Sequence, residues 1–248
     1  MVKKKRGKKK AEKKEDIVEK KEDIVEKTVK DKDFKEKQNK QIILIGGLML
    51  AVIIIIIAVP LIKHNFFDRF HYINLDFQKT PNGDDILYST EFPVIDEKGQ
   101  ITHTYSIYFN NDPRELEDID IAQKIKEQGV QFIQKNTAFI SIDPDMNPCS
   151  DNSVAMFTLG NFLSDSGLVV KSAFSDKEYA EATGFPYKDC RQSSSNTVIK
   201  ISSGNKTKID QKSTNCYEVV YKDCEIQQVT EKFILIILED YMDQFQEA

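Results

Sequence analysis

The sequence predicts an α+β fold with a mixed sheet, preceded by one transmembrane helix. Residues 42–62 form an uncharged, almost wholly apolar run, residues 72–109 carry apolar side chains at alternating positions, and residues 138–170 have the pattern strand, helix, strand. Alternation with a period of two is typical of half-buried strands, and a strand–helix–strand unit is typical of a parallel strand pair. A mixed sheet follows if both patterns belong to one domain.

The apolar run has the length of a membrane span. At about 1.5 Å per residue, a helix over these residues covers roughly 31 Å, close to the ~30 Å hydrocarbon core of a bilayer. Gly46, Gly47 and Pro60 are tolerated in membrane helices. The run is longer than the apolar region of a signal peptide, and Ala58-Val59-Pro60 matches a cleavage site poorly. We therefore predict an uncleaved transmembrane helix over residues 41–62.

The charge balance differs on the two sides of this run. Residues 1–40 carry 17 Lys+Arg and 10 Asp+Glu, and the whole-chain totals of 35 and 40 leave 18 and 30 for the remainder. Basic residues favour the cytoplasmic side of a membrane. The sequence thus predicts a single-pass protein of the cell membrane, with a cytoplasmic N-terminus and an extracytoplasmic domain over residues 63–248.

Residues 1–40 are expected to form a basic, mostly disordered cytoplasmic arm because more than half of them are charged. The heptad Lys14–Lys20 recurs unchanged as Lys21–Lys27, as in a short coiled coil, a partner-binding helix or a simple duplication. The basic residues of Met1–Lys10 are expected to meet anionic lipid headgroups of the bilayer. Base-stacking aromatic residues are absent among them, so no nucleic-acid partner is expected.

The exported domain is predicted to begin with an antiparallel β-meander. Its strands follow the alternating runs at residues 72–77, 86–92 and 105–109, separated by turns at residues 81–85 and 96–99. A helix is then expected from Asp112 as N-cap and Pro113 at its first position to Gly129. A short helix followed by a strand near Val130 is the alternative.

The second half is predicted to hold a βαβ unit, a β-hairpin and a C-terminal helix. The βαβ unit combines strands near residues 138–142 and 168–170 with a helix over residues 151–164. Strands at residues 198–201 and 216–221 are expected to form the hairpin through the turn at residues 202–205. The final amphipathic helix is expected to start at Asp223 and to be buried over most of its circumference at Phe233–Leu238, where six apolar residues follow one another.

All four cysteines lie in the exported part and predict two disulfides. Three pairings are possible, and we favour Cys149 with Cys190 and Cys216 with Cys224. The spacings contain no C-x-x-C pair and the three histidines lie far away in sequence, so no metal site is expected.

Asp143-Pro144-Asp145 directly follows the strand at residues 138–142, where α/β enzymes often hold a cation. This layout resembles the first motif of haloacid-dehalogenase-type phosphatases, in which an aspartate nucleophile precedes a second acid by two residues. The chain departs from that family at Met146 and Asn147 and has no later Asp-Asp pair in a suitable position. Turn formation explains the same residues.

Asn205-Lys206-Thr207 is an N-glycosylation acceptor sequence in an expected turn. No complete catalytic constellation is present, so the sequence favours an extracytoplasmic binding domain with an unknown protein partner and no cofactor. One alternative is a membrane-anchored, metal-dependent hydrolase that uses Asp143 and Asp145. The other is a receptor-like protein whose cytoplasmic arm binds a partner.

Overall fold

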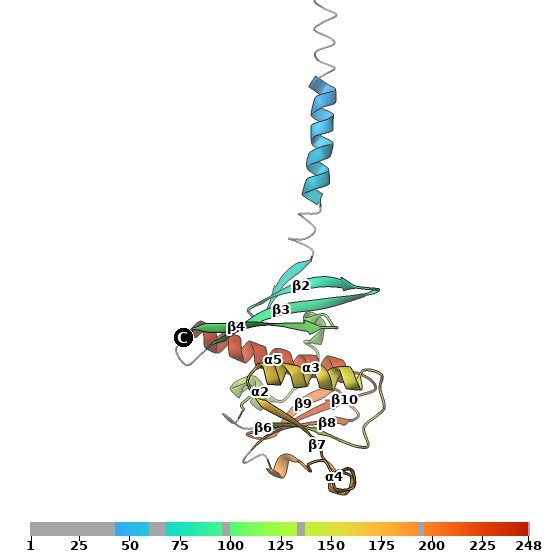
Figure 1. The fold of residues 1–248 in the computed structure, drawn as a ribbon, viewed down its shortest axis with the longest axis vertical. Helices are drawn as coiled ribbons and strands as arrows, with labels where there is room; N and C mark the ends of the chain where they lie inside the picture. The colour runs from blue at the N-terminus through green and yellow to red at the C-terminus, as the bar shows by residue number, and fades with distance from the viewer. Residues whose placement is uncertain (1–42, 60–67, 96–99, 133–136, 193–195, 248) are drawn as a thin grey trace, which may run out of the picture. The chain divides into compact units, whose positions relative to one another are not determined.

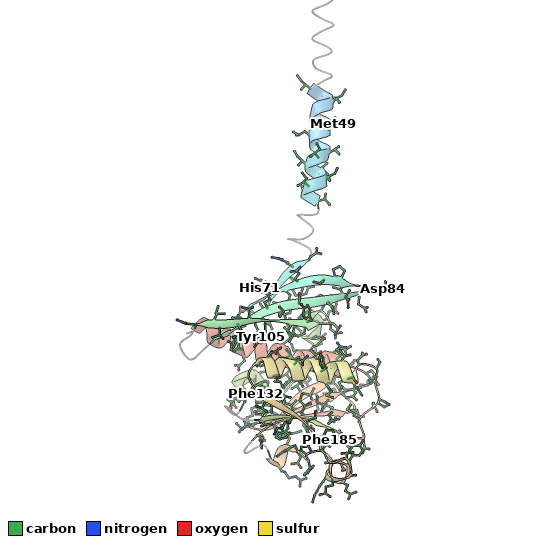
Figure 2. All side chains as sticks on the ribbon, in the orientation of Figure 1. Met49, His71, Asp84, Tyr105, Phe132 and Phe185 are labelled. Atoms are coloured by element: carbon green, nitrogen blue, oxygen red, sulfur yellow. A yellow bond between two sulfur atoms is a disulfide. The ribbon has the colours of Figure 1, made fainter. Side chains whose placement is uncertain are left out.

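The computed structural model describes residues 43–59, 68–95, 100–132, 137–192 and 196–247. The chain divides into two compact units, Met1–His64 and Asn65–Ala248. In the first unit, residues 43–59 form a helix with exposed apolar side chains, Met49 among them (Figure 2). No helix within the described ranges is long and apolar enough to cross a membrane. The arm with its heptad repeat and both ends of the apolar run lie outside the described residues.

The second unit begins with a four-stranded antiparallel sheet in the order β1-β2-β3-β4. Its strands are β1 (Arg69–Tyr72), β2 (Leu75–Asn82), β3 (Asp85–Ile95) and β4 (Ile101–Phe109). Phe77 of β2 lies opposite Thr90 of β3, which lies opposite Ile107 of β4, and all three are buried. The predicted antiparallel meander is present, but its first alternating run, residues 72–77, is not one strand: Ile73 and Asn74, with φ of 46° and 59°, form the turn between β1 and β2. The predicted turn at residues 96–99 lies outside the described residues.

A six-stranded mixed sheet follows, in the order β5-β9-β10-β8-β6-β7. Its strands are β5 (Asp120–Ile121), β6 (Thr137–Ile142), β7 (Val169–Phe174), β8 (Thr197–Ser203), β9 (Lys208–Ser213) and β10 (Cys216–Tyr221). Strands β10, β8, β6 and β7 are parallel to one another, whereas β9 runs antiparallel to β10. The mixed sheet is therefore present, and the predicted βαβ unit consists of β6, α3 and β7.

The helices are α2 (Gln123–Gln128), α3 (Asn152–Asp165), α4 (Lys177–Thr183) and α5 (Ile226–Glu247), with 3₁₀ turns η2 (Pro113–Leu116) and η3 (Cys190–Gln192). Helix α3 buries the predicted residues Ala155, Leu159, Phe162 and Leu163. Gly160 lies on the side of α3 that faces β6, where a Cβ would stand 3.8 Å from Cδ1 of Ile140.

Helices α3 and α5 form a middle layer between the two sheets (Figure 1). Phe162 of α3 packs against Phe92 of the four-stranded sheet, with ring centroids 5.7 Å apart. Phe233 of α5 packs against Tyr217 of the six-stranded sheet at 5.6 Å. Because α5 has a sheet on either side, it is buried over most of its circumference at Phe233–Leu238, as the apolar run predicts.

The predicted hairpin between residues 198–201 and 216–221 is wrong. Strands β8 and β10 pair in parallel, with Cys216 opposite Val198. Strand β9 lies between them in sequence and returns the chain, so that both strands run in the same direction. Its segment Lys208–Ser213 has one buried residue, Ile209, and therefore lacks the apolar alternation that would have revealed it.

The single helix predicted from Asp112 to Gly129 is also wrong, although its two ends are correct. Asp112 Oδ1 accepts a hydrogen bond from the backbone N–H of Arg114, and the backbone N–H of Gly129 donates to the Ile125 carbonyl. Between them the chain leaves η2, forms β5 and pairs Ile121 with Ile209 before α2 begins. Residues 129–132 form no strand. A tertiary strand pairing has overridden helical spacing here.

Asp223 does not cap α5. Its φ of 53° places it in a left-handed turn, and the helix begins at Ile226. The backbone N–H of Val229 donates to the carbonyl of Glu225, which starts the helical ladder two residues after the predicted cap.

Candidate functional site

Asp143 and Asp145 lie at the carboxyl end of β6, beside the end of β8. The backbone N–H of Asp143 donates to the Ile201 carbonyl, and Asp143 Oδ1 accepts from the backbone N–H of Asp145 at 3.1 Å. This local hydrogen bond is the turn that Asp and Pro favour at a strand exit. Among the described residues, no three His, Cys, Asp or Glu side chains converge in a way that could hold a metal ion. The observed geometry is that of a turn.

The disulfides join Cys149 to Cys224 and Cys190 to Cys216, so the favoured pairing was wrong. Cys216 is the first residue of β10, and Cys224 follows the end of that strand. Six extended residues span roughly 20 Å, whereas the Cα atoms of two bridged cysteines must lie within about 7 Å, so these two cannot pair. The carboxyl ends of β6 and β10 lie at the same end of the sheet. Cys149 follows β6 and Cys224 follows β10, so the two cysteines meet there. Their Cα atoms are 5.6 Å apart.

Asn205 is exposed in the connection between β8 and β9. Thr207 of the same sequon accepts a hydrogen bond from the backbone N–H of Lys222 at 3.0 Å, and its hydroxyl bonds to the Glu225 carboxylate. The asparagine side chain is therefore presented to solvent while the threonine fixes the turn.

Outward residues of β8, β9 and β10 in the six-stranded sheet form charge pairs. Glu218 on β10 lies within 3.7 Å of the Lys200 ammonium and 3.4 Å of the Lys212 ammonium. Asp210 on β9 lies directly opposite Glu218 and is itself 2.7 Å from Lys208. Because these lysines lie between carboxylates that would otherwise repel each other, the positive and negative charges on these three strands neutralise one another.

The outer face of the four-stranded sheet differs, because it carries a hollow of about 870 Å³. One row across the strands has Arg69 opposite Gln78, Gln78 opposite Ser89, and Ser89 opposite Tyr108. A second row contains His71 opposite Asp76 and Glu91 opposite Ser106. The residues of both rows line the hollow, and they alternate along their strands with the buried side chains of the core.

The chemistry of this hollow suits a polar ligand. His71 Nδ1 lies 3.0 Å from Asp76 Oδ1, but both side chains are largely exposed, so this pair adds little to stability. Glu91 and Gln78 offer acceptors, Arg69 offers donors, and Tyr108 presents an exposed ring with a hydroxyl. The hollow therefore combines both signs of charge with an aromatic surface. Figure 2 labels His71 on this sheet.

Sequence reasoning missed this hollow because the polar residues of its two rows occupy ordinary outward positions of strands. The signal was the mostly polar outward phase of the meander, which includes Asp76, Gln78, Ser89, Glu91 and Ser106. What the sequence lacks is the cross-strand register, which sets these residues side by side.

Sequence reasoning also missed a group of titratable side chains buried around α5. Burial raises the pKa of Glu231 above its ordinary value, although four hydrogen bonds act to lower it. Burial lowers the pKa of Lys232, with Glu239 and Glu117 acting in the opposite direction. Burial and the neighbouring Glu117 raise the pKa of Tyr72 to about 12. Glu231 lies where α5 meets the end of β4, and Lys232 lies near Glu117, which follows η2. A helix with a sheet on either side buries some of its polar residues.

Comparison of the chain with protein-family models, with characterised proteins and with solved structures found no match.

Proposed function

We propose that this chain is a single-pass membrane protein whose extracytoplasmic domain binds a polar ligand or protein surface through the hollow of the four-stranded sheet. The observation that carries the proposal is the contrast between the two outer sheet faces. On the six-stranded sheet the outward charges of β8, β9 and β10 neutralise one another, whereas the outer face of the four-stranded sheet is hollowed and carries donors, acceptors and an exposed aromatic ring. Aromatic residues and arginine are enriched at binding surfaces.

The membrane assignment is supported by the apolar run of residues 42–62, whose described part is helical, and by the opposite charge of its flanks. Both disulfides lie within the second unit, which suits an oxidising compartment. In this topology the exposed Asn205 is available for glycosylation, and the basic arm faces anionic lipid headgroups in the cytoplasm.

The topology is tested by protease treatment of intact cells. The expected result is loss of the part that contains β1 to α5, with residues 1–40 protected and the protected fragment remaining in the membrane after alkaline extraction. Protection of the whole chain in intact cells would contradict the orientation.

The binding face is tested with a photo-crosslinking amino acid at position 108 of the full chain in its native membrane. Position 179 is the matched control, because Tyr108 and Tyr179 are similarly exposed, at 54% and 46%, and Tyr179 lies on α4. Adducts are expected at position 108 only, and Glu91→Lys is expected to remove them. Equal labelling at both positions, or none at position 108, would refute the hollow as the binding face.

A further inference from the structure

A second cavity, of about 340 Å³, lies where α3 and α5 of the middle layer meet the four-stranded sheet. Buried side chains from these elements line it: Phe92 of β3, Phe162 and Leu163 of α3, and Leu238 of α5. Protein interiors seldom leave voids larger than a water molecule, so a cavity of this size is unusual between packed layers. Its volume falls within the range of small-molecule sites.

This cavity has an almost wholly apolar lining and is reached from solvent. Val94, Leu168 and Ile237 also line it, and their side chains are only half-buried. Ser166 contributes a hydroxyl, which already donates a hydrogen bond of 2.8 Å to the Phe162 carbonyl. Among the described residues that line the cavity, none is charged. A ligand is therefore recognised by its apolar body, and a charged end must stay in solvent.

We propose that this cavity binds the hydrocarbon chain of a single-chain lipid such as a fatty acid, whose polar end stays in solvent. An apolar cavity of about 150 Å³ holds a benzene molecule, so one of about 340 Å³ takes roughly 12 carbon atoms. That number suits one hydrocarbon chain and leaves no room for the second chain of a phospholipid. Each methylene group that enters an apolar site raises the affinity about fourfold.

The choice of a lipid over another apolar ligand rests on the proposed membrane anchor. Residues 63–67 separate the apolar run from Asp68, the first described residue of the domain. A segment of five residues spans at most about 18 Å. A domain tethered so closely to a bilayer lies where hydrocarbon chains are the most concentrated apolar ligand. The cavity does not depend on what the hollow binds.

The test is photo-labelling of the full chain in phosphatidylcholine vesicles, with adducts mapped by mass spectrometry of peptides. The probe is a fatty acid of about 12 carbons that carries a diazirine at the end of its chain. Adducts are expected in segments 162–168 and 237–241, which contribute to the cavity lining, and in the apolar run 42–62. Labelling of the run without the cavity segments would overturn the proposal. Labelling of the cavity segments without the run would support the cavity site and contradict the membrane anchor.

Val94→Phe fills part of the cavity and is expected to reduce labelling of the cavity segments about tenfold or more, because each displaced methylene costs about fourfold in affinity. Leu168→Phe fills the cavity from a different segment and serves if Val94→Phe does not fold. Val154→Phe is the matched control, because Val154 is 47% exposed on α3 and lies outside the cavity lining. It is expected to leave the labelling unchanged.

Formation of both disulfides in each variant, read by electrophoresis without reductant, reports that the domain has folded. Undiminished labelling of the cavity segments in a folded Val94→Phe or Leu168→Phe chain would overturn the proposal. A phospholipid with the diazirine in one of its two chains is the second probe, and it is expected to label the apolar run alone. Equal labelling of the cavity segments by this phospholipid would refute the single-chain ligand.

Discussion

Glu231 on α5 accepts two hydrogen bonds from Asn111, one from its backbone N–H at 3.1 Å and one from its side-chain amide at 2.8 Å. The backbone N–H of Asn110 and the side-chain amide of Gln227 donate to the other carboxylate oxygen, at 2.7 and 3.3 Å. Through this carboxylate, α5 holds the connection that leaves β4. The middle layer and the four-stranded sheet are thus joined by a buried polar contact as well as by apolar packing.

Glu231→Gln is expected to destabilise the domain by about 1 to 3 kcal/mol, because the amide nitrogen of glutamine cannot accept the hydrogen bonds that one carboxylate oxygen now receives. Denaturant unfolding followed by circular dichroism measures this, since the chain has no tryptophan. Glu178→Gln on the exposed face of α4 is the control and should leave the midpoint unchanged. A Glu231→Gln midpoint equal to wild type would show that the contact does not stabilise the fold.

The pH dependence of stability is expected to carry a signature of Glu231. Its raised pKa means that the folded state holds a proton at pH values where the unfolded state, with an ordinary value of 4.5, has lost it. The contribution of the Glu231 proton to the free energy of unfolding is therefore complete below pH 4.5, and it is lost as the pH rises through the raised pKa. Wild type should lose stability relative to Glu231→Gln across that window. A parallel pH profile for the two proteins would contradict the assignment.

The two disulfides are expected to contribute unequally, because they close loops of different length. Their sequence separations are 75 for Cys149–Cys224 and 26 for Cys190–Cys216. Chain entropy gives about 4.5 and about 3.5 kcal/mol, respectively. Paired Cys→Ala variants, compared by denaturant unfolding, should show the larger loss for the first pair. Peptide mapping without reductant checks the connectivity itself, and a peptide linking Cys149 to Cys190 would refute it.

Gly129→Ala is expected to be strongly destabilising for two reasons. Its φ of 67° and ψ of −169° lie in a region that is almost exclusive to glycine, and a Cβ would approach Asp240 Oδ1 within 2.4 Å. We expect a loss of about 3 kcal/mol. Gly184→Ala is the control, because Gly184 also has positive φ but a Cβ there meets nothing within 4 Å. Adding Asp240→Ala to Gly129→Ala should recover part of the loss, and no recovery would mean that backbone strain alone is responsible.

The pair Asp112–Arg114 is expected to resist acid. The Arg114 hydrogen bonds hold the pKa of Asp112 below its ordinary value of 3.8, although burial opposes this. The contribution of the Asp112–Arg114 pair to the free energy of unfolding is present above pH 3.8, and it is lost as the pH falls through the lowered pKa. Arg114→Lys loses the forked contact and the stacking of the guanidinium on Phe70, 4.1 Å from the ring centroid.

Because Arg114 is about half exposed, we expect a loss of about 1 kcal/mol for Arg114→Lys near neutral pH. The loss should shrink below pH 3.8, as acid unfolding curves of the two proteins will show. Arg191→Lys, at an exposed arginine that also pairs with an aspartate, should leave the unfolding curve unchanged within error. An equal effect at both positions would argue against a special role for the Phe70 stack.

Local patterns predicted the elements whose two faces differ in polarity. The meander and α3 are such elements, and their buried residues follow the expected spacing. Strand β9 was missed because its outward residues are charged and Ile209 is its single buried apolar residue. The segment from Asp112 to Gly129 was misread because the pairing of Ile121 with Ile209 is a contact between distant parts of the chain.

The sequence by itself determined which segments can be buried: the apolar run, the alternating strands, the nearly all-round burial of α5 and the even set of cysteines. The tertiary structure alone decided which residues meet. It paired Cys149 with Cys224, buried Glu231 against Asn111, and aligned the outward residues of four strands into a hollow. The physical reason is that periodicity records how a segment divides between core and solvent. The register and direction of strands, which bring distant residues together, depend on the packing of the whole domain.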